Sequence, residues 1–139
     1  MTGAMSRRWL AALSLTAVVA APAAAETYPI AVLRGLDKVT ARISTIEAPI
    51  GHPVRFGTLE IVVRTCDKRP PEEPPESAAF LDIWEIRKEQ PAAKLFRGWM
   101  FASSPALSAM DHPVYDVWVL DCVSTSSTAG TNAPAEKSE

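Results

Sequence analysis

Apolar and polar residues alternate along several short segments of this chain, and a period of two is typical of half-buried β-strands. In residues 59–64, for example, leucine, isoleucine and valine take one side while glutamate and arginine take the other. The same reasoning predicts strands at residues 39–46, 59–66, 80–86, 95–101 and 114–122, with a polar loop containing Pro91 joining the third and fourth as a hairpin. The last segment is apolar on both sides, so we expect it to lie centrally in its sheet.

One short helix is expected among these strands. Ser104 followed by Pro105 is typical of a helix N-cap with proline in the first helical position, which predicts one or two turns at residues 106–110. Twelve prolines in 139 residues argue against a helical bundle. The expected fold class is therefore all-β with one short helix, arranged as a small β-sandwich or a partly closed barrel.

The N-terminal segment has the pattern of a secretory signal peptide. Arg7 and Arg8 precede an uncharged run at residues 9–21, and alanines at 23–25 offer a cleavage site before Glu26. This run is too short and too rich in alanine for a membrane span, which favours a signal peptide that is removed. No transmembrane segment is therefore expected in the mature chain. Export by the general or the twin-arginine route is left open. We expect residues 1–25 to be removed, 26–123 to form one domain in the periplasm, and the Ser/Thr/Ala-rich residues 124–139 to be a disordered tail.

The cysteine count fits an exported protein. Both cysteines, Cys66 and Cys122, lie in the mature part, and an oxidising compartment favours a disulfide between them. A metal site with His52 or His112 lacks the paired spacing that such sites use. Each cysteine ends its predicted strand, so a bridge requires the two strands to run in the same direction, as parallel neighbours or across facing sheets.

Charge narrows the choice of partner. Without its first 25 residues the chain has 12 basic and 16 acidic residues, a net charge of −4. An acidic domain without a basic stripe is poorly suited to nucleic acid or to an anionic membrane surface. No cofactor is expected.

Four stretches of sequence carry a family resemblance, at residues 33–42, 54–61, 66–80 and 98–122. Together they resemble the DUF2155 family of exported alphaproteobacterial proteins. The resemblance implies a periplasmic or envelope location and a shared pair of cysteines, here Cys66 and Cys122. It implies no activity, because the function of the family is unknown.

The proline-rich run within the third stretch is a candidate binding surface. Its prolines favour a stiff polyproline II segment and its glutamates keep that segment solvated. The run could be offered to a partner with an aromatic groove, or it could be only a rigid crossover. The candidate surface consists of Pro70, Pro71, Glu72, Glu73, Pro74, Pro75 and Glu76, together with Trp99.

The remaining aromatic residues have two interpretations. The favoured one is that they fill the core of a small β-domain. The alternative is that tryptophans exposed on one face bind glycan or peptide. The residues concerned are Trp84, Trp99, Trp118, Phe80, Phe96, Phe101 and Tyr115.

Catalysis has weak support. Ser103, Ser104, Asp111, His112 and Asp116 include a nucleophile, a base and an orienting group, but no nucleophile-elbow motif is present and Ser104 is expected to cap the helix. We therefore predict that the protein is not an enzyme. The leading hypothesis is a non-catalytic periplasmic protein that binds another envelope component, most simply an envelope protein. The alternatives are a small-ligand or lipid carrier in envelope lipid trafficking, and a Ser/His hydrolase.

Overall fold

The computed structural model describes residues 24–126. Nearly all of the predicted signal peptide (1–25) and most of the predicted tail (124–139) lie outside this range. Within it the chain forms the strands β1 (Glu26–Thr27), β2 (Ile30–Asp37), β3 (Arg42–Pro49), β4 (Pro53–Phe56), β5 (Leu59–Lys68), β6 (Ser77–Glu85), β7 (Ala93–Phe101) and β8 (Tyr115–Val123), with the 3-10 helix η1 (Pro105–Ser108) before β8.

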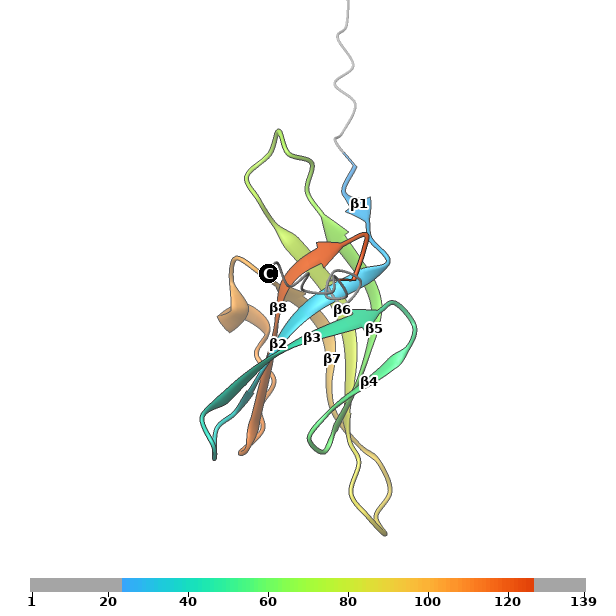
Figure 1. The fold of residues 1–139 in the computed structure, drawn as a ribbon, viewed down its shortest axis with the longest axis vertical. Helices are drawn as coiled ribbons and strands as arrows, with labels where there is room; N and C mark the ends of the chain where they lie inside the picture. Colours follow the sequence, from blue (N-terminus) through green and yellow to red (C-terminus); the bar gives the residue numbers. More distant parts are fainter. Residues whose placement is uncertain (1–23, 127–139) are drawn as a thin grey trace, which may run out of the picture.

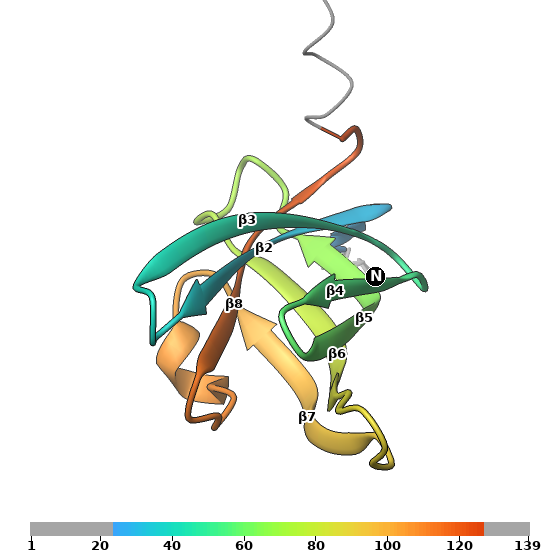
Figure 2. The same ribbon diagram turned by 60° about the horizontal axis from the view of Figure 1, so that its bottom comes forward.

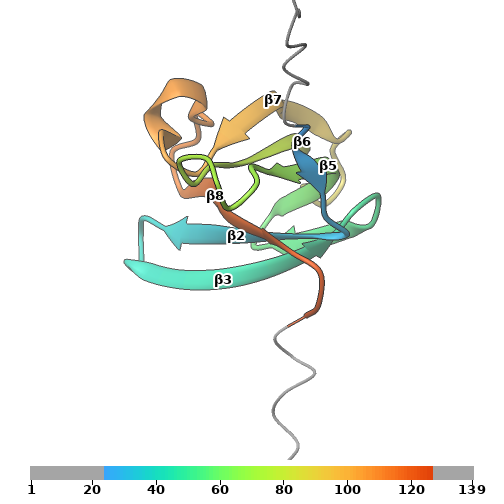
Figure 3. The ribbon, with the colours of Figure 1, turned by 90° about the horizontal axis from the view of Figure 1, so that it is seen from above.

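The strands form two antiparallel sheets that face each other (Figures 1 and 3). The larger sheet has the order β1-β5-β6-β7, and β4 also pairs with β5. The smaller sheet has the order β3-β2-β8. Figure 2 shows the two layers crossing at an angle, with β4 beside β5. The structure thus confirms the predicted all-β class as a small sandwich rather than a closed barrel.

The N-terminal half of the domain differs from the prediction. No strand was predicted for β2, which lies at the centre of the smaller sheet, or for β4. The strand expected at 39–46 begins only at Arg42. The residues before it form a tight turn in which the carboxylate of Asp37 accepts hydrogen bonds from the backbone N–H groups of Val39 and Thr40, and Ala41 has φ 54°. Valine at position 39 belongs to this turn and is exposed.

Two further expectations were wrong in detail. The helix is a single 3-10 turn, and Ser104 stands before it without a side-chain capping hydrogen bond. Strand β8 pairs only with β2 and is therefore an edge strand of its sheet, not a central one. Its two apolar sides have different roles: Val117 and Val119 are buried in the core, whereas Trp118 is only half-buried on the outer face.

The core between the sheets is aliphatic. Its largest fully buried side chains are Leu33, Leu59, Ile61, Val63, Leu81, Ile83, Met100, Val117 and Val119. The prediction that the aromatics fill the core was wrong for most of them. Phe96 and Tyr115 pack against the core, but the three tryptophans, Phe80 and Phe101 do not belong to it. Strand parity explains this outcome, because residues next to Met100 or Leu81 in sequence must point to the opposite face.

The predicted disulfide is present. Cys66 and Cys122 are joined, with their Cα atoms 5.7 Å apart, and both are buried. The bond joins β5 of one sheet to β8 of the other, which confirms the alternative of facing sheets. For the closed segment of 56 residues, the chain-entropy model gives roughly 4 kcal/mol of stabilisation.

Candidate functional site

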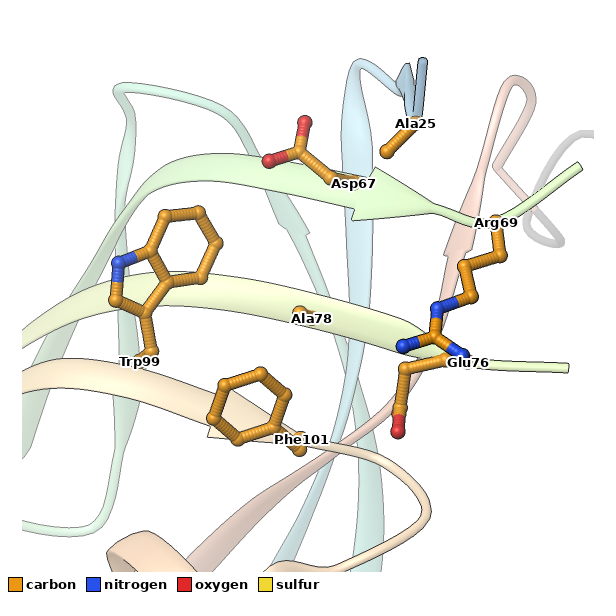
Figure 4. Close-up of a pocket in the computed structure, with 7 residues that line it drawn as sticks. All are labelled: Ala25, Asp67, Arg69, Glu76, Ala78, Trp99 and Phe101. Atoms are coloured by element: carbon orange, nitrogen blue, oxygen red, sulfur yellow. The ribbon is translucent and has the colours of Figure 1, made fainter. Parts of the chain in front are cut away.

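A groove lies on the outer face of the larger sheet, away from the core (Figure 4). It has a volume of about 340 Å³. Its lining is mainly apolar and consists of Ala25, Asp67, Arg69, Glu76, Ala78, Trp99 and Phe101. In Figure 4 the rings of Trp99 and Phe101 stand side by side on β7, with Arg69 and Glu76 at one end.

The register of the three central strands builds this groove. Asp67 on β5 pairs with Ala78 on β6, and Ala78 pairs in turn with Phe101 on β7. Because the middle residue has only a methyl side chain, the sheet is low there, between a carboxylate on one side and an aromatic ring on the other. Trp99 lies two residues before Phe101 and therefore on the same face. Its side chain is exposed enough, at 40%, to meet a ligand.

The acidic groups at the rim are occupied by structural contacts. The carboxylate of Glu76 accepts hydrogen bonds from the backbone N–H and the hydroxyl of Ser103. Burial raises the pKa of Glu76, but these hydrogen bonds outweigh it and hold the pKa below the ordinary value. Asp67 accepts hydrogen bonds from the hydroxyls of Thr27, at 2.8 Å, and Thr65, at 3.3 Å. The groove thus offers an aromatic surface rather than a free acid or base.

The proline-rich loop between β5 and β6 projects from the end of the larger sheet (Figure 1). Its base is fixed by a hydrogen bond from the Arg69 N–H to the Glu76 carbonyl, at 3.0 Å, and an inner turn is closed by one from the Glu73 N–H to the Pro70 carbonyl, at 3.1 Å. The tip is exposed at Glu72 and Pro74. The loop is therefore both anchored and accessible.

The predicted binding surface is only partly brought together. Glu76 and Trp99 line the same groove. Pro70, Pro71, Glu73 and Pro75 instead line a neighbouring hollow of about 310 Å³, together with Glu26, Tyr28, Lys68 and Arg69. Glu72 and Pro74 lie outside the lining of both. Sequence reasoning missed Phe101, Ala78, Asp67 and Arg69 as site residues. Alternation with the core residues of β7 and β6 could have placed Phe101 and Ala78 on the face that carries Trp99. Alternation could not have placed Asp67 there, because the register of β5 shifts between Val63 and Thr65.

A buried carboxylate lies next to the groove on the same face. Asp82 on β6 is fully buried, and its Oδ2 accepts a hydrogen bond from Arg64 Nε at 2.8 Å. Its Oδ1 lies 3.5 Å from Arg97 Nε without forming a hydrogen bond. The guanidinium of Arg97 also lies 5.8 Å from the centre of the Phe80 ring, which in turn meets Trp99 edge to face. Both arginine side chains are about half exposed.

The serine and histidine of the hydrolase hypothesis have other contacts. His112 is buried, and its Nδ1 accepts hydrogen bonds from the backbone N–H groups of Val114 and Tyr115. Its Nε2 lies 3.3 Å from Glu85 Oε1. Ser103 bonds Glu76, and within residues 24–126 no contact joins it or Ser104 to His112. The histidine thus ties the start of β8 to the end of β6.

The described residues offer no group of three His, Cys, Asp or Glu side chains that could hold a metal ion. No helix within residues 24–126 is long and apolar enough to cross a membrane.

A polar junction lies beside the disulfide. Asp121 Oδ1 on β8 accepts from Lys68 on β5 at 2.8 Å, from the Ser77 hydroxyl on β6 at 2.9 Å and from the Cys122 N–H at 2.8 Å. Burial raises the pKa of Asp121, but these contacts outweigh it and lower the pKa overall. The junction therefore connects the two sheets at the end of the molecule that carries the proline-rich loop.

Comparison with known proteins gives a family and an uncharacterized relative. A family model described as an uncharacterized protein conserved in bacteria (DUF2155) matches residues 31–122. The uncharacterized protein RP359 of Rickettsia prowazekii (strain Madrid E) is 31% identical over 87 residues, which are 63% of this chain and 56% of that protein. The chain thus spans little more than half the length of this relative. No solved structure matches the chain. Because the family model matches most of the chain, from the second residue of β2 to Cys122 in β8, the chain belongs to the DUF2155 family.

Proposed function

We propose that this chain is a non-catalytic binding domain of the periplasm that holds another envelope component on the outer face of its larger sheet. The observation that carries the proposal is the groove of Trp99 and Phe101, which is exposed, mainly apolar and adjacent to the anchored proline-rich loop. Exposed aromatic side chains on a rigid sheet are typical of recognition surfaces, because they contribute a large contact area at a small cost in side-chain entropy.

The geometry favours binding over turnover. The acids at the rim are held by serine and threonine, and the buried histidine uses both ring nitrogens within the fold. The core between the sheets is occupied by aliphatic side chains, so an interior carrier cavity has no supporting observation. If the leader is removed before Glu26, as the sequence predicts, the groove loses Ala25 and becomes more open at that end.

The test is site-specific photo-crosslinking in the native bacterium. A photoreactive residue is placed at Trp99, at Glu72 in the loop, or at Ile43 on β3 of the opposite sheet, where the side chain is 58% exposed. We expect the same partner to be captured from positions 99 and 72 but not from position 43. Fractionation of the same cells shows whether the captured complex is periplasmic.

The control separates loss of binding from loss of folding. Trp99→Ala removes the centre of the groove but no core contact, so the purified variant should keep the thermal transition of the wild type within a few degrees. It should nevertheless lose capture from position 72. Equal capture from position 43 and position 99, or capture from none of the three, contradicts the proposal.

A further inference from the structure

The proline-rich loop carries exposed acidic side chains that have few contacts within their own molecule. Glu72 is exposed and forms no ion pair with any residue in the described range, and Glu73 has only a 3.9 Å contact with Arg69. A hydrogen bond from the Glu73 N–H to the Pro70 carbonyl closes a turn at the tip, and the prolines restrict the backbone around it. The loop projects past the end of the larger sheet (Figure 1).

The outer face of the larger sheet has the complementary chemistry. Two residues beyond the aromatic groove along β7, Arg97 stands opposite Asp82, and Arg64 contacts the same carboxylate. Each arginine meets this carboxylate through Nε, and among the described residues no hydrogen bond from its terminal nitrogens is present, although the Arg97 guanidinium also contacts the Phe80 ring. Lys94, exposed on the same strand, adds a third cation. Arg64, Arg97 and Lys94 thus form a cationic row on a chain that is acidic overall, and one buried carboxylate contacts the two arginines.

The loop also offers an apolar partner to the aromatic groove. Its tip is a turn closed by the hydrogen bond from the Glu73 N–H to the Pro70 carbonyl, so exposed prolines and glutamates lie within one short segment. A proline of this tip can therefore lie against Trp99 while a glutamate reaches Arg97, which is two residues away on β7, roughly 7 Å along the face. Guanidinium and carboxylate groups are well matched in geometry for such a contact.

We propose that two copies of this chain recognise each other through these surfaces, with the acidic proline-rich loop of one copy lying along the aromatic groove and the cationic row of the other. The loop joins β5 to β6, and the face is formed by β5, β6 and β7 of the same sheet, so a two-fold axis would pair each loop with the face of the other copy and close the dimer. The inference goes beyond the proposed function. It also means that an envelope partner binding the same face has to displace the second copy.

The test is the oligomeric state of the purified chain, measured by sedimentation equilibrium between about 10 μM and 1 mM, a range that reaches weak association. The loop variant carries Glu72→Lys and Glu73→Lys. The face variant carries Lys94→Glu and Arg97→Glu, and it keeps the Arg64–Asp82 hydrogen bond. We expect the wild type to dimerise, each variant alone to dimerise at least about tenfold more weakly, and an equimolar mixture to recover the wild-type affinity within about threefold, because the exchanged charges are again complementary.

A charge reversal away from both surfaces is the control for this test. Lys88→Glu reverses an exposed charge in the turn after β6 and should leave the dimer unchanged. Should the face variant fail to fold in a thermal melt, Trp99→Ala replaces it and must weaken the dimer by a similar factor. A wild type that is monomeric throughout, a dimer insensitive to the loop and face variants, or a mixture without recovery overturns the inference. A monomer that still crosslinks to a different protein from position 99 leaves the proposed function standing, whereas a dimer that crosslinks from position 99 only to a second copy of the chain contradicts the proposed function alone.

Discussion

Cys66 and Cys122 face each other across the core because each follows a β-bulge in its own strand. In β5 the register shifts at Arg64, and in β8 it shifts at Leu120. Without these bulges each cysteine would share the parity of outward-facing residues, since the buried residues before them, such as Val63 and Val119, are at odd positions. Two local irregularities thus turn both sulfurs inward, and the bond that results links the two sheets.

Loss of this disulfide should strongly lower the stability of the folded domain. Cys66→Ala, or reduction of the wild type, is expected to lower the free energy of unfolding by about 2–4 kcal/mol, because the open segment regains entropy in the unfolded chain. Thermal melts with and without reductant measure the effect. A double Cys66→Ala/Cys122→Ala variant serves as control and should not respond to reductant. Identical melting of the wild type under both conditions would contradict the assignment.

The sequence pattern located β5, β6, β7 and most of β8, because clean alternation or a dense apolar run survives there. It missed β2 for a physical reason. This central strand has buried residues on one face and half-buried Val32, Arg34 and Leu36 on the other, so no two-residue alternation of polarity is visible. Its glycine, Gly35, further weakens the strand signal.

The candidate site was less predictable than the fold. Trp99 could be named from sequence, but its exposure depends on Met100 taking the inward position of β7. The pairing of Asp82 with Arg97 depends on register, and a shift between Ile83 and Trp84 sets that register. Neither a bulge nor a cross-strand neighbour can be read from composition, and this is why the cationic row was found only in the structure.

Acid should weaken the junction beside the disulfide. The pKa of Asp121 is lower in the folded chain than its ordinary value of about 3.9, so the unfolded chain binds a proton more readily. Its contribution is therefore complete above about pH 4 and is lost as the pH falls through the folded pKa. Asp121→Asn should lower the melting temperature at pH 7 and flatten its decline between about pH 5 and pH 2. Melting curves at half-unit steps measure both slopes, and parallel profiles for variant and wild type would refute this account.

The buried histidine should matter for stability. His112→Ala leaves the backbone N–H groups of Val114 and Tyr115 without their acceptor, which we expect to cost about 2–4 kcal/mol. His52 is the matched control, because it is exposed and its replacement by alanine should change the free energy of unfolding by less than about 0.5 kcal/mol. Chemical denaturation of both variants tests the difference, and equal small effects would show that the contacts of His112 are dispensable.

Substitutions at two glycines should distinguish the energetic cost of a left-handed backbone from the cost of crowding by a neighbouring side chain. Gly51 and Gly57 both have positive φ, at 79° and 57°, but only Gly57 is crowded: a Cβ there would lie 2.4 Å from atoms of the Tyr115 ring, whereas a Cβ on Gly51 would meet nothing within 4 Å. Gly51→Ala should therefore cost only the left-handed penalty, about 1–2 kcal/mol. Gly57→Ala should cost about 1–3 kcal/mol more, because the ring must shift and its edge-to-face contact with Phe56 is disturbed. Urea denaturation gives both values, and Tyr115→Ala should remove the excess at Gly57. An excess that persists in the Tyr115→Ala background would mean that the backbone, and not the ring, requires glycine at this turn.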